Sequence, residues 1–142
     1  MGGHSSTRKI VGEWDYHDEQ GQVVYTKLKY EPKSFAWKTA QGYGLNGATK
    51  VPYNLPELLS AKNKWVFLCE GEKDCSTLAK AGFVATTFGG SSDLPAEALQ
   101  YFTNKKVFIC GDYDKAGAKR VKETYEALLP IAKDLRHAWL QE

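Results

Sequence analysis

The sequence predicts an α/β fold in which a mostly parallel sheet, flanked by helices, follows a small antiparallel β-rich unit. Two continuous apolar runs, WVFLC at residues 65–69 and KVFIC at 106–110, are typical of strands that are buried on both faces of a parallel sheet. Helix-like patterns separate these runs, as the crossover connections of a parallel sheet require. Before residue 64, aromatic residues instead recur at alternating positions between turn-rich segments, which is typical of antiparallel strands.

The N-terminal part is expected to contain three antiparallel strands. Segments 9–18 and 21–30 flank the turn-forming sequence DEQG, and SFAWKT at 34–39 adds a third strand. QGYGLNG at 41–47 then breaks the regular pattern. Aromatic side chains at alternating positions would line one covered face of this sheet: Trp14, Tyr16, Tyr25, Tyr30, Phe35 and Trp37. Such a stripe is more typical of a packed core than of a surface that stacks bases.

The rest of the chain alternates predicted strands with predicted helices. In YNLPELLSAKN, Asn54 can cap a short helix and Pro56 fits its first turn, and Gly82 is a stop signal for the next helix. The expected strands at 65–69, 83–88, 106–110 and 134–141 alternate with expected helices at 53–63, 74–82, 96–102 and 114–130. The apolar face of the last helix would consist of Ala118, Val121, Tyr125 and Leu128.

These patterns divide the chain into three parts. Residues 1–8 are interpreted as a flexible arm or an expression remnant, residues 9–62 as the β-rich unit, and residues 63–142 as the α/β core. No apolar run is long enough to span a bilayer, and the start lacks the apolar stretch of a secretory signal. We therefore expect a cytoplasmic protein without a membrane partner.

Net charge and cysteine spacing narrow the possible functions. The formal net charge of +2 does not by itself indicate a polyanion partner, which would require a local basic patch. The three cysteines, Cys69, Cys75 and Cys110, lack the paired spacing of a zinc site. Cys69 and Cys110 occupy matching places in the two apolar runs, so we expect these two to be reduced and buried.

Acidic residues follow both apolar runs. Glu70 comes directly after the first run, with Asp74 near the start of the next helix, and Asp112 and Asp114 follow the second run. If the two strands are neighbours, these carboxylates meet at one edge of the sheet. Because clustered carboxylates repel one another, they need a cation, and hard oxygen ligands suit Mg²⁺ or Mn²⁺. The alternative for Asp114 is that it caps the helix that starts at Lys115.

A metal ion held by carboxylates suits phosphoryl or nucleotidyl transfer. The chain has no Walker-type phosphate loop, so it is not a P-loop ATPase by itself. Four basic residues near the acids could contact phosphates or could form a solvated helix face: Lys73, Lys115, Lys119 and Arg120. The backbone amides of Gly89 and Gly90 could hold a phosphate, and a plain tight turn is the alternative.

Three motifs resemble the Toprim family, a metal-binding domain shared by bacterial-type primases, topoisomerases and some nucleases. They are CEGEKD at 69–74, ATTFGG at 85–90 and GDYDKAG at 111–117, in the family's order and spacing. The sequence from YNLPELL to VFLCEGEKD is similar to that of phage and mobile-element primases or primase-helicases. The resemblance covers residues 51–140. It implies a Toprim-like, Rossmann-like core.

The resemblance also implies roles for the acids. Glu70 would act in catalysis, as a metal ligand or as a general acid or base. Asp112 and Asp114 match the family's metal-binding pair, and Asp74 matches an acid that helps to build the site.

The function that the resemblance implies is metal-dependent nucleotidyl transfer by a bacteriophage-type DNA primase, a transferase that makes primers for DNA replication. Its cofactor would be Mg²⁺ or Mn²⁺. Its partners would be a single-stranded DNA template, nucleoside triphosphates, and the helicase and zinc-binding regions of a larger protein. The isolated fragment is expected to be weakly active or inactive. Two alternatives stay open: a Toprim nuclease that hydrolyses phosphodiester bonds, and a non-catalytic nucleic-acid-binding module of a larger replication protein.

Overall fold

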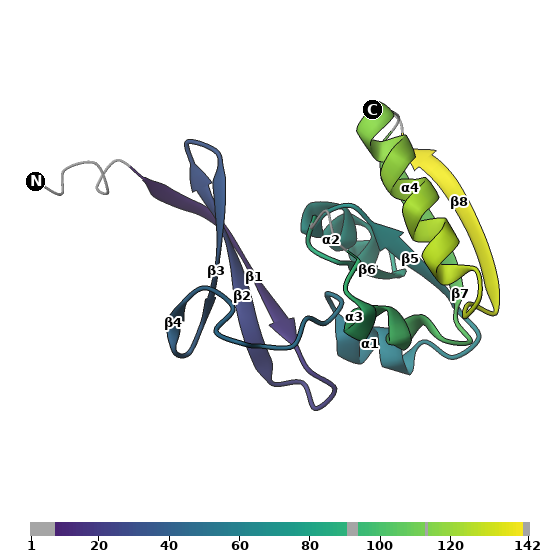
Figure 1. The fold of residues 1–142 in the computed structure, drawn as a ribbon, viewed down its shortest axis with the longest axis horizontal. Coiled ribbons are helices and arrows are strands. Elements are labelled where there is room, and N and C mark those ends of the chain that lie inside the picture. The colour runs from purple at the N-terminus through teal and green to yellow at the C-terminus, as the bar shows by residue number, and fades with distance from the viewer. Residues whose placement is uncertain (1–7, 91–93, 113, 141–142) are drawn as a thin grey trace, which may run out of the picture.

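The computed structural model describes residues 8–90, 94–112 and 114–140, which form two four-stranded sheets (Figure 1). The antiparallel sheet contains β1 (Lys9–His17), β2 (Val23–Glu31), β3 (Ser34–Thr39) and β4 (Gly42–Tyr43), in that order. The parallel sheet contains β5 (Trp65–Cys69), β6 (Val84–Thr87), β7 (Lys106–Asp112) and β8 (Asp134–Leu140), in the order β6-β5-β7-β8. The helices are α1 (Leu55–Ser60), α2 (Glu72–Lys80), α3 (Ala96–Leu99), the 3₁₀ turn η2 (Gln100–Phe102) and α4 (Lys115–Leu128). The predicted fold class is confirmed.

The β1–β2 hairpin forms where the turn residues predict it. The Asp18 carboxylate accepts hydrogen bonds from the backbone amides of Gln20 and Gln22, both at 2.9 Å, and Gly21 adopts a positive φ of 82°. The register pairs Tyr16 with Tyr25, and Trp14 with Lys27, which in turn faces Trp37 on β3. Aromatic side chains therefore stand in cross-strand rows on the side of the sheet that faces the α/β core. The prediction is wrong for Tyr30, because strand alternation places it on the other face, where Arg8 lies 3.9 Å from its ring centroid.

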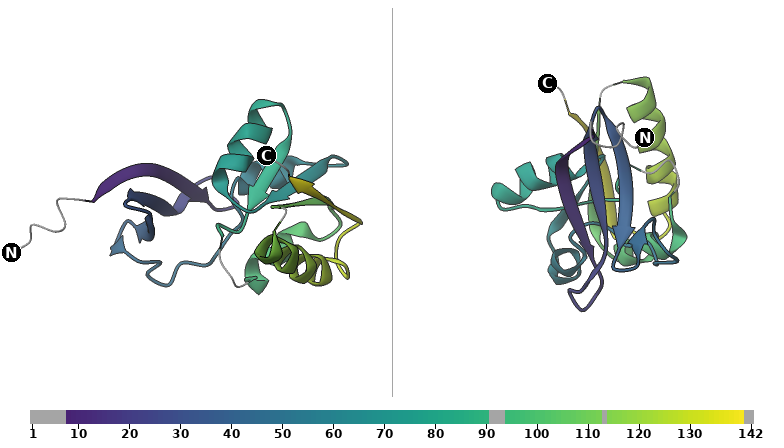
Figure 2. Two further views of the ribbon diagram at one scale, coloured as in Figure 1. Left: turned by 90° about the horizontal axis from the view of Figure 1, so that it is seen from above. Right: turned by 90° about the vertical axis from the view of Figure 1, so that its left-hand side faces the viewer.

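Helices cover both faces of the parallel sheet (Figure 2). On one face, apolar side chains of β5 and β7 pack against α1, η2 and α4; this core includes Leu55, Leu58, Val66, Leu68, Phe102, Val107, Ile109, Val121 and Leu128. On the other face, Cys69 and Cys110 pack with Cys75 of α2. All three cysteines are free and buried, as predicted for Cys69 and Cys110. No helix among the described residues is long and apolar enough to cross a membrane.

Several local details differ from the predictions. The antiparallel sheet has a fourth, two-residue strand, β4, within the segment 41–47 that was expected to break the regular pattern. Helix α2 begins at Glu72, two residues early, because Gly71 in extended conformation serves as its N-cap. Asn54 does not cap α1 with its side chain; its φ is 59° and its Nδ2 donates instead to the Ala85 carbonyl at 3.0 Å.

Strand β7 continues two residues beyond its apolar run because β8 pairs with it along its whole length. On α4, the buried residues are Gly117, Val121, Thr124 and Leu128, so the predicted apolar face is wrong at the exposed Ala118. The first turn of α4 packs against the core through Gly117, and Ala118 points to solvent.

Candidate active site

Strands β5 and β7 are parallel neighbours, so their carboxyl ends meet at one edge of the sheet. Leu68 pairs with Ile109 in this register, which brings Glu70, just after β5, to the same edge as Asp112, the last residue of β7. This adjacency is the condition on which the predicted carboxylate site depended. The side chain of Asp112 lies outside the described part of the structure, so its position within the site stays a prediction.

Glu70 and Asp74 flank the start of α2. Gly71 caps this helix, and Asp74 lies in its first turn, where the helix dipole favours negative charge. Both carboxylates are half-buried, and both line the same cleft. The local sequence EGEKD therefore places Glu70 and Asp74, together with the buried Glu72, around a helix N-terminus at the edge of the sheet.

Asp114 is the N-cap of α4. Its carboxylate accepts a hydrogen bond from the Gly117 amide at 2.6 Å, and the residue is exposed. The capping role that the sequence allowed is thus present. Because a carboxylate has two oxygens, capping is compatible with the metal-binding role, which stays a prediction.

The residues at this edge suit a hard divalent cation in chemistry. Carboxylate oxygens are the ligands that Mg²⁺ and Mn²⁺ prefer, whereas the buried thiols nearby are not. Among the side chains that the structure describes, no three from His, Cys, Asp and Glu lie close enough together to hold an ion. The predicted set of Glu70, Asp74, Asp112 and Asp114 would be completed by Asp112, whose side chain is not described.

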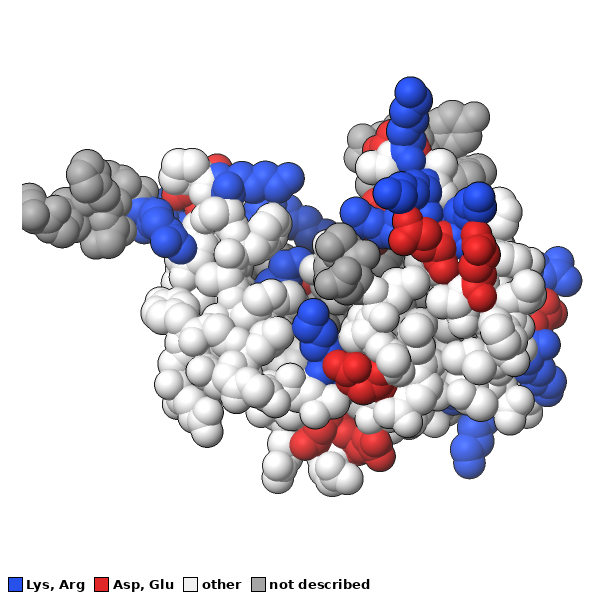
Figure 3. All heavy atoms as spheres, in the orientation of Figure 1, with Lys and Arg blue, Asp and Glu red and all other residues white. Residues whose placement is uncertain are grey.

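A cleft of about 900 Å³ separates the antiparallel sheet from this edge. One wall is the inner face of β1–β3, and the other contains Glu70, Gly71, Glu72 and Asp74. Among the residues that the structure describes, six cations also line it: Lys27, Lys29, Lys33, Lys50, Lys73 and Arg120. Lysine and arginine side chains gather on both sides of the hollow between the antiparallel sheet and α4 (Figure 3). The local basic patch that the net charge could not reveal is therefore present.

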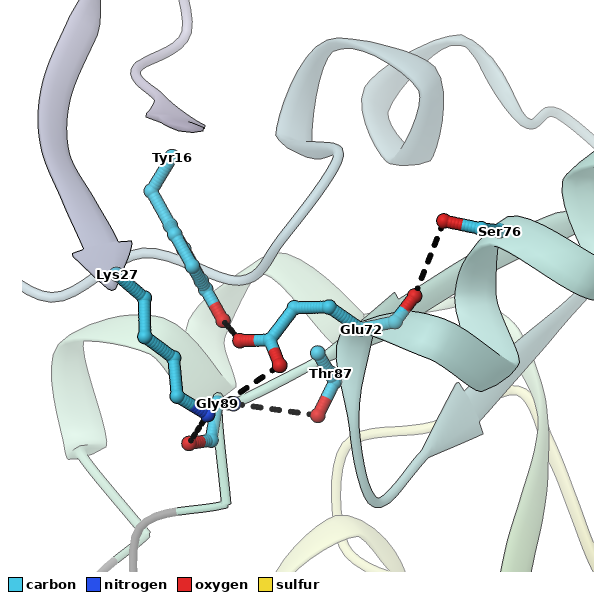
Figure 4. Close-up of polar contacts among 6 residues, drawn as sticks. All are labelled: Tyr16, Lys27, Glu72, Ser76, Thr87 and Gly89. Atoms are coloured by element: carbon cyan, nitrogen blue, oxygen red, sulfur yellow. Dashed lines mark hydrogen bonds and ion pairs between the residues drawn. The ribbon is translucent and has the colours of Figure 1, made fainter. Parts of the chain in front are cut away.

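A buried cluster joins the two walls at the floor of the cleft (Figure 4). Lys27 Nζ lies 3.2 Å from Glu72 Oε1 and donates to the Gly89 carbonyl at 2.8 Å, while the Tyr16 hydroxyl donates to Glu72 Oε2 at 2.5 Å. Lys27 is only 8% exposed and Glu72 only 4%. Burial, followed by the adjacent Glu72 charge, raises the pKa of Tyr16 far above its ordinary value, so this phenol stays a hydrogen-bond donor.

Gly89 fits this cluster because it has no side chain. Its φ is 86°, and a Cβ atom there would lie 2.8 Å from the Tyr16 hydroxyl and 3.0 Å from the Trp37 ring. Its amide donates to the Thr87 hydroxyl at 3.2 Å, as in a tight turn. Phosphate binding by Gly89 and Gly90 stays a prediction, although both residues line the cleft.

The predicted basic residues separate into two groups. Lys73 and Arg120 line the cleft. Lys115 and Lys119 are exposed on α4, and Lys119 lies 4.0 Å from Glu123 in an exposed ion pair. Phosphate contact by any of these four residues stays a prediction.

Sequence reasoning missed the buried cluster of Tyr16, Lys27 and Glu72. The signal for Lys27 was available, because strand alternation places Tyr25, Lys27 and Lys29 on one face. A lysine on an aromatic, covered face needs a buried acidic partner or belongs to a binding site. Glu72 carried no such signal, because an acid in the first turn of a helix is ordinary.

Comparison with known proteins agrees with this architecture. Residues 65–142, more than half of the chain, match the family model described as Toprim domain. The primase fragment of the bacteriophage T7 primase-helicase protein is similar in structure, with a TM-score of 0.62, 20% identity, and coverage of 95% of this chain and 58% of that one. The Escherichia coli primase catalytic core is similar with a TM-score of 0.71 and 23% identity, and the match covers 95% of this chain and 45% of that one. A DNA primase domain from Pseudomonas aeruginosa is similar with a TM-score of 0.70 and 21% identity, and the match covers 92% of this chain and 43% of that one.

No curated protein sequence matches the chain. The chain spans about half the length of the primase structures that it matches. Nearly all of it is covered by these structures, which means that the antiparallel sheet as well as the parallel sheet follows the fold of primase cores. By its sequence motifs, its parallel sheet and its match to the family model, the chain belongs to the Toprim family.

Proposed function

We propose that the chain is the catalytic core of a DNA primase and carries out metal-dependent nucleotidyl transfer on a single-stranded DNA template. The observation that supports this proposal is the cleft, in which a carboxylate edge faces a wall that is rich in lysine and aromatic side chains. Phosphates of a nucleotide or a strand need cations, and the reacting centre needs carboxylates that hold a divalent metal. Lysine side chains and the carboxylates Glu70 and Asp74 line the same opening, which supports the proposal.

The proposed site assigns a role to each wall. Glu70, Asp74, Asp112 and Asp114 would hold Mg²⁺ or Mn²⁺, which supplies charge neutralisation at the transferred phosphoryl group. Glu70 would take the proton of the attacking 3′-hydroxyl, a role that suits a half-buried carboxylate at the edge of the cleft. Lys73 and Arg120 would bind phosphate oxygens from the same side. The larger protein would add helicase and zinc-binding regions.

Primer synthesis by the full-length protein tests the proposal. Glu70→Gln and Asp112→Asn keep the size of each side chain but remove its charge, so each should lower template-dependent incorporation of labelled nucleotides by at least about 100-fold. Asp134→Asn is the matched control, because Asp134 opens β8 at the opposite edge of the sheet. Primer synthesis that survives both substitutions would refute the assignment.

Metal binding can be measured without activity. Calorimetric titration of this chain with Mn²⁺ should show binding that is lost in the Asp112→Asn/Asp114→Asn double variant. Asparagine caps helices as well as aspartate does, so the fold of α4 should be preserved. Nicking of a labelled circular DNA with Mg²⁺, in the absence of primer synthesis, would instead assign the chain as a nuclease. Template binding without metal-dependent turnover by the full-length protein would assign it as a binding module.

A further inference from the structure

The inner face of the antiparallel sheet carries two cross-strand rows that face the cleft. In one row, Lys27 of β2 pairs with Trp14 of β1 and with Trp37 of β3. In the next row, Lys29 pairs with Gly12 and Phe35. Because directly paired residues point to the same side of a sheet, the first row places a lysine between two aromatic rings, and the second places a lysine between a glycine and an aromatic ring, on one surface.

Of the three aromatic residues in these rows, Trp37 packs against the core, whereas Trp14 and Phe35 extend beyond it into the cleft. Trp37 packs edge-on against Tyr16 and Tyr25, with ring centroids 5.6 and 5.2 Å apart. Phe35 lines the cleft and is 48% exposed. Lys27 Nζ lies 4.7 Å from the Phe35 ring centroid. The aromatic stripe therefore continues from the core into the opening.

Trp14 lies flat across β1. A Cβ atom on Gly12 would be 2.6 Å from the far edge of the indole ring, so this arrangement requires glycine at position 12. The φ of Gly12 is not positive, and its role is thus to make room rather than to turn the chain. The indole is half-buried and lines the cleft beside the lysines. A flat, partly exposed indole next to cations is a surface on which a planar group can stack.

We propose that Trp14 and Phe35 form a stacking site for a nucleobase whose phosphates lie on the lysines of the cleft. This inference rests on the proposed function and adds the base-binding part of the site. Aromatic rings beside a basic groove bind bases without regard to sequence, since every base has a π-face. An acidic peptide would use the cations but not the exposed rings, and a purely apolar ligand would bury the cations without a partner.

The test compares two fluorescein-labelled oligonucleotides of equal length, oligo-dT and its abasic counterpart, in fluorescence anisotropy with the chain described here. The intact protein should bind oligo-dT about tenfold more tightly than the abasic strand, because a tenfold preference lies within the range that one stacked base contributes. Trp14→Leu/Phe35→Leu should abolish this preference and leave binding of the abasic strand unchanged. Trp14→Phe and Phe35→Tyr, which keep a ring, should retain most of the preference.

Phe83→Leu is the matched control, because Phe83 is 49% exposed, as Phe35 is, but lies outside the cleft at the other face of the core. The Phe35→Leu variant by itself changes an exposed side chain and serves if the double variant does not fold. Equal binding of both oligonucleotides by the intact protein would overturn the stacking site and leave the proposed function standing. Failure to bind either oligonucleotide would overturn both.

A parallel titration with ATP distinguishes the source of the base. Weaker ATP binding in Phe35→Leu places the base of the incoming nucleotide on the site. Unchanged ATP binding together with weaker oligo-dT binding places a base of the strand there. If neither affinity changes in either aromatic variant, the proposal is wrong.

Discussion

Replacement of Glu72 by glutamine should destabilise the protein by about 2–3 kcal/mol. At the 3.2 Å between Lys27 Nζ and Glu72 Oε1, two unit charges attract by about 5 kcal/mol at an effective dielectric constant near 20. Desolvation of the two ions offsets part of this attraction. Loss of the carboxylate charge leaves Lys27 buried with the Gly89 carbonyl and a neutral amide, which accounts for the remaining cost.

Urea unfolding measures this effect. With an m-value of about 2–3 kcal/mol per M for a domain of this size, the midpoint of Glu72→Gln should fall by about 1 M. Lys27→Met should cost a similar amount, and the double variant should cost no more than either single variant, because each single change leaves one buried group without its counterpart. Glu123→Gln removes the exposed pair with Lys119 and should cost less than about 0.5 kcal/mol. A loss below 1 kcal/mol in Glu72→Gln, or strictly additive effects, would refute the argument.

Three further predictions concern the backbone and the core. Gly89→Ala should lower the free energy of unfolding by about 1–3 kcal/mol more than Gly21→Ala does in urea titrations, because both glycines have positive φ but only Gly89 lacks room for a Cβ. Asp114→Ala should cost about 1 kcal/mol through loss of the α4 cap, whereas Asp114→Asn should be close to neutral in the same assay. Burial raises the pKa of Tyr25 from 10 to about 12, so the stability that this phenol contributes is complete below pH 10 and is lost as the pH rises toward 12. Unfolding titrations from pH 8 to 11.5 should show this loss, and Tyr25→Phe should reduce it.

The periodicity of the sequence was sufficient to predict most of the fold. The runs at Trp65–Cys69 and Ser34–Thr39 became strands with those same bounds, because both patterns are local and strong. The start of α2 and the end of β7 were missed for non-local reasons. Each depends on a neighbour in space, namely the extended Gly71 that caps the helix and the strand β8 that pairs with Asp112.

The candidate site was predicted only on the side where the motifs lie. Glu70 and Asp74 follow directly from the strand-then-acid pattern, and the structure places both in the cleft. The opposite wall could not be predicted, because its identity depends on how the antiparallel sheet docks. Lys27 is 45 residues away from Glu72 in sequence, and no local pattern predicts such a pair. The aromatic stripe was interpreted as core, which holds for Trp37 and misses the exposure of Phe35.

The buried cluster of Lys27, Glu72 and Tyr16 has a consequence for how the cleft meets its ligand. To move one wall away from the other, the molecule would have to expose a charged pair and break the hydrogen bonds around it, at a cost comparable to a sizeable share of a domain's whole stability. The cleft is therefore expected to keep a fixed width and not to open and close around a ligand. Its width is set during folding, so a bound ligand would lose its own conformational freedom while the protein loses little. Selection among ligands would then depend on which of them fits a rigid slot, not on which can trigger closure.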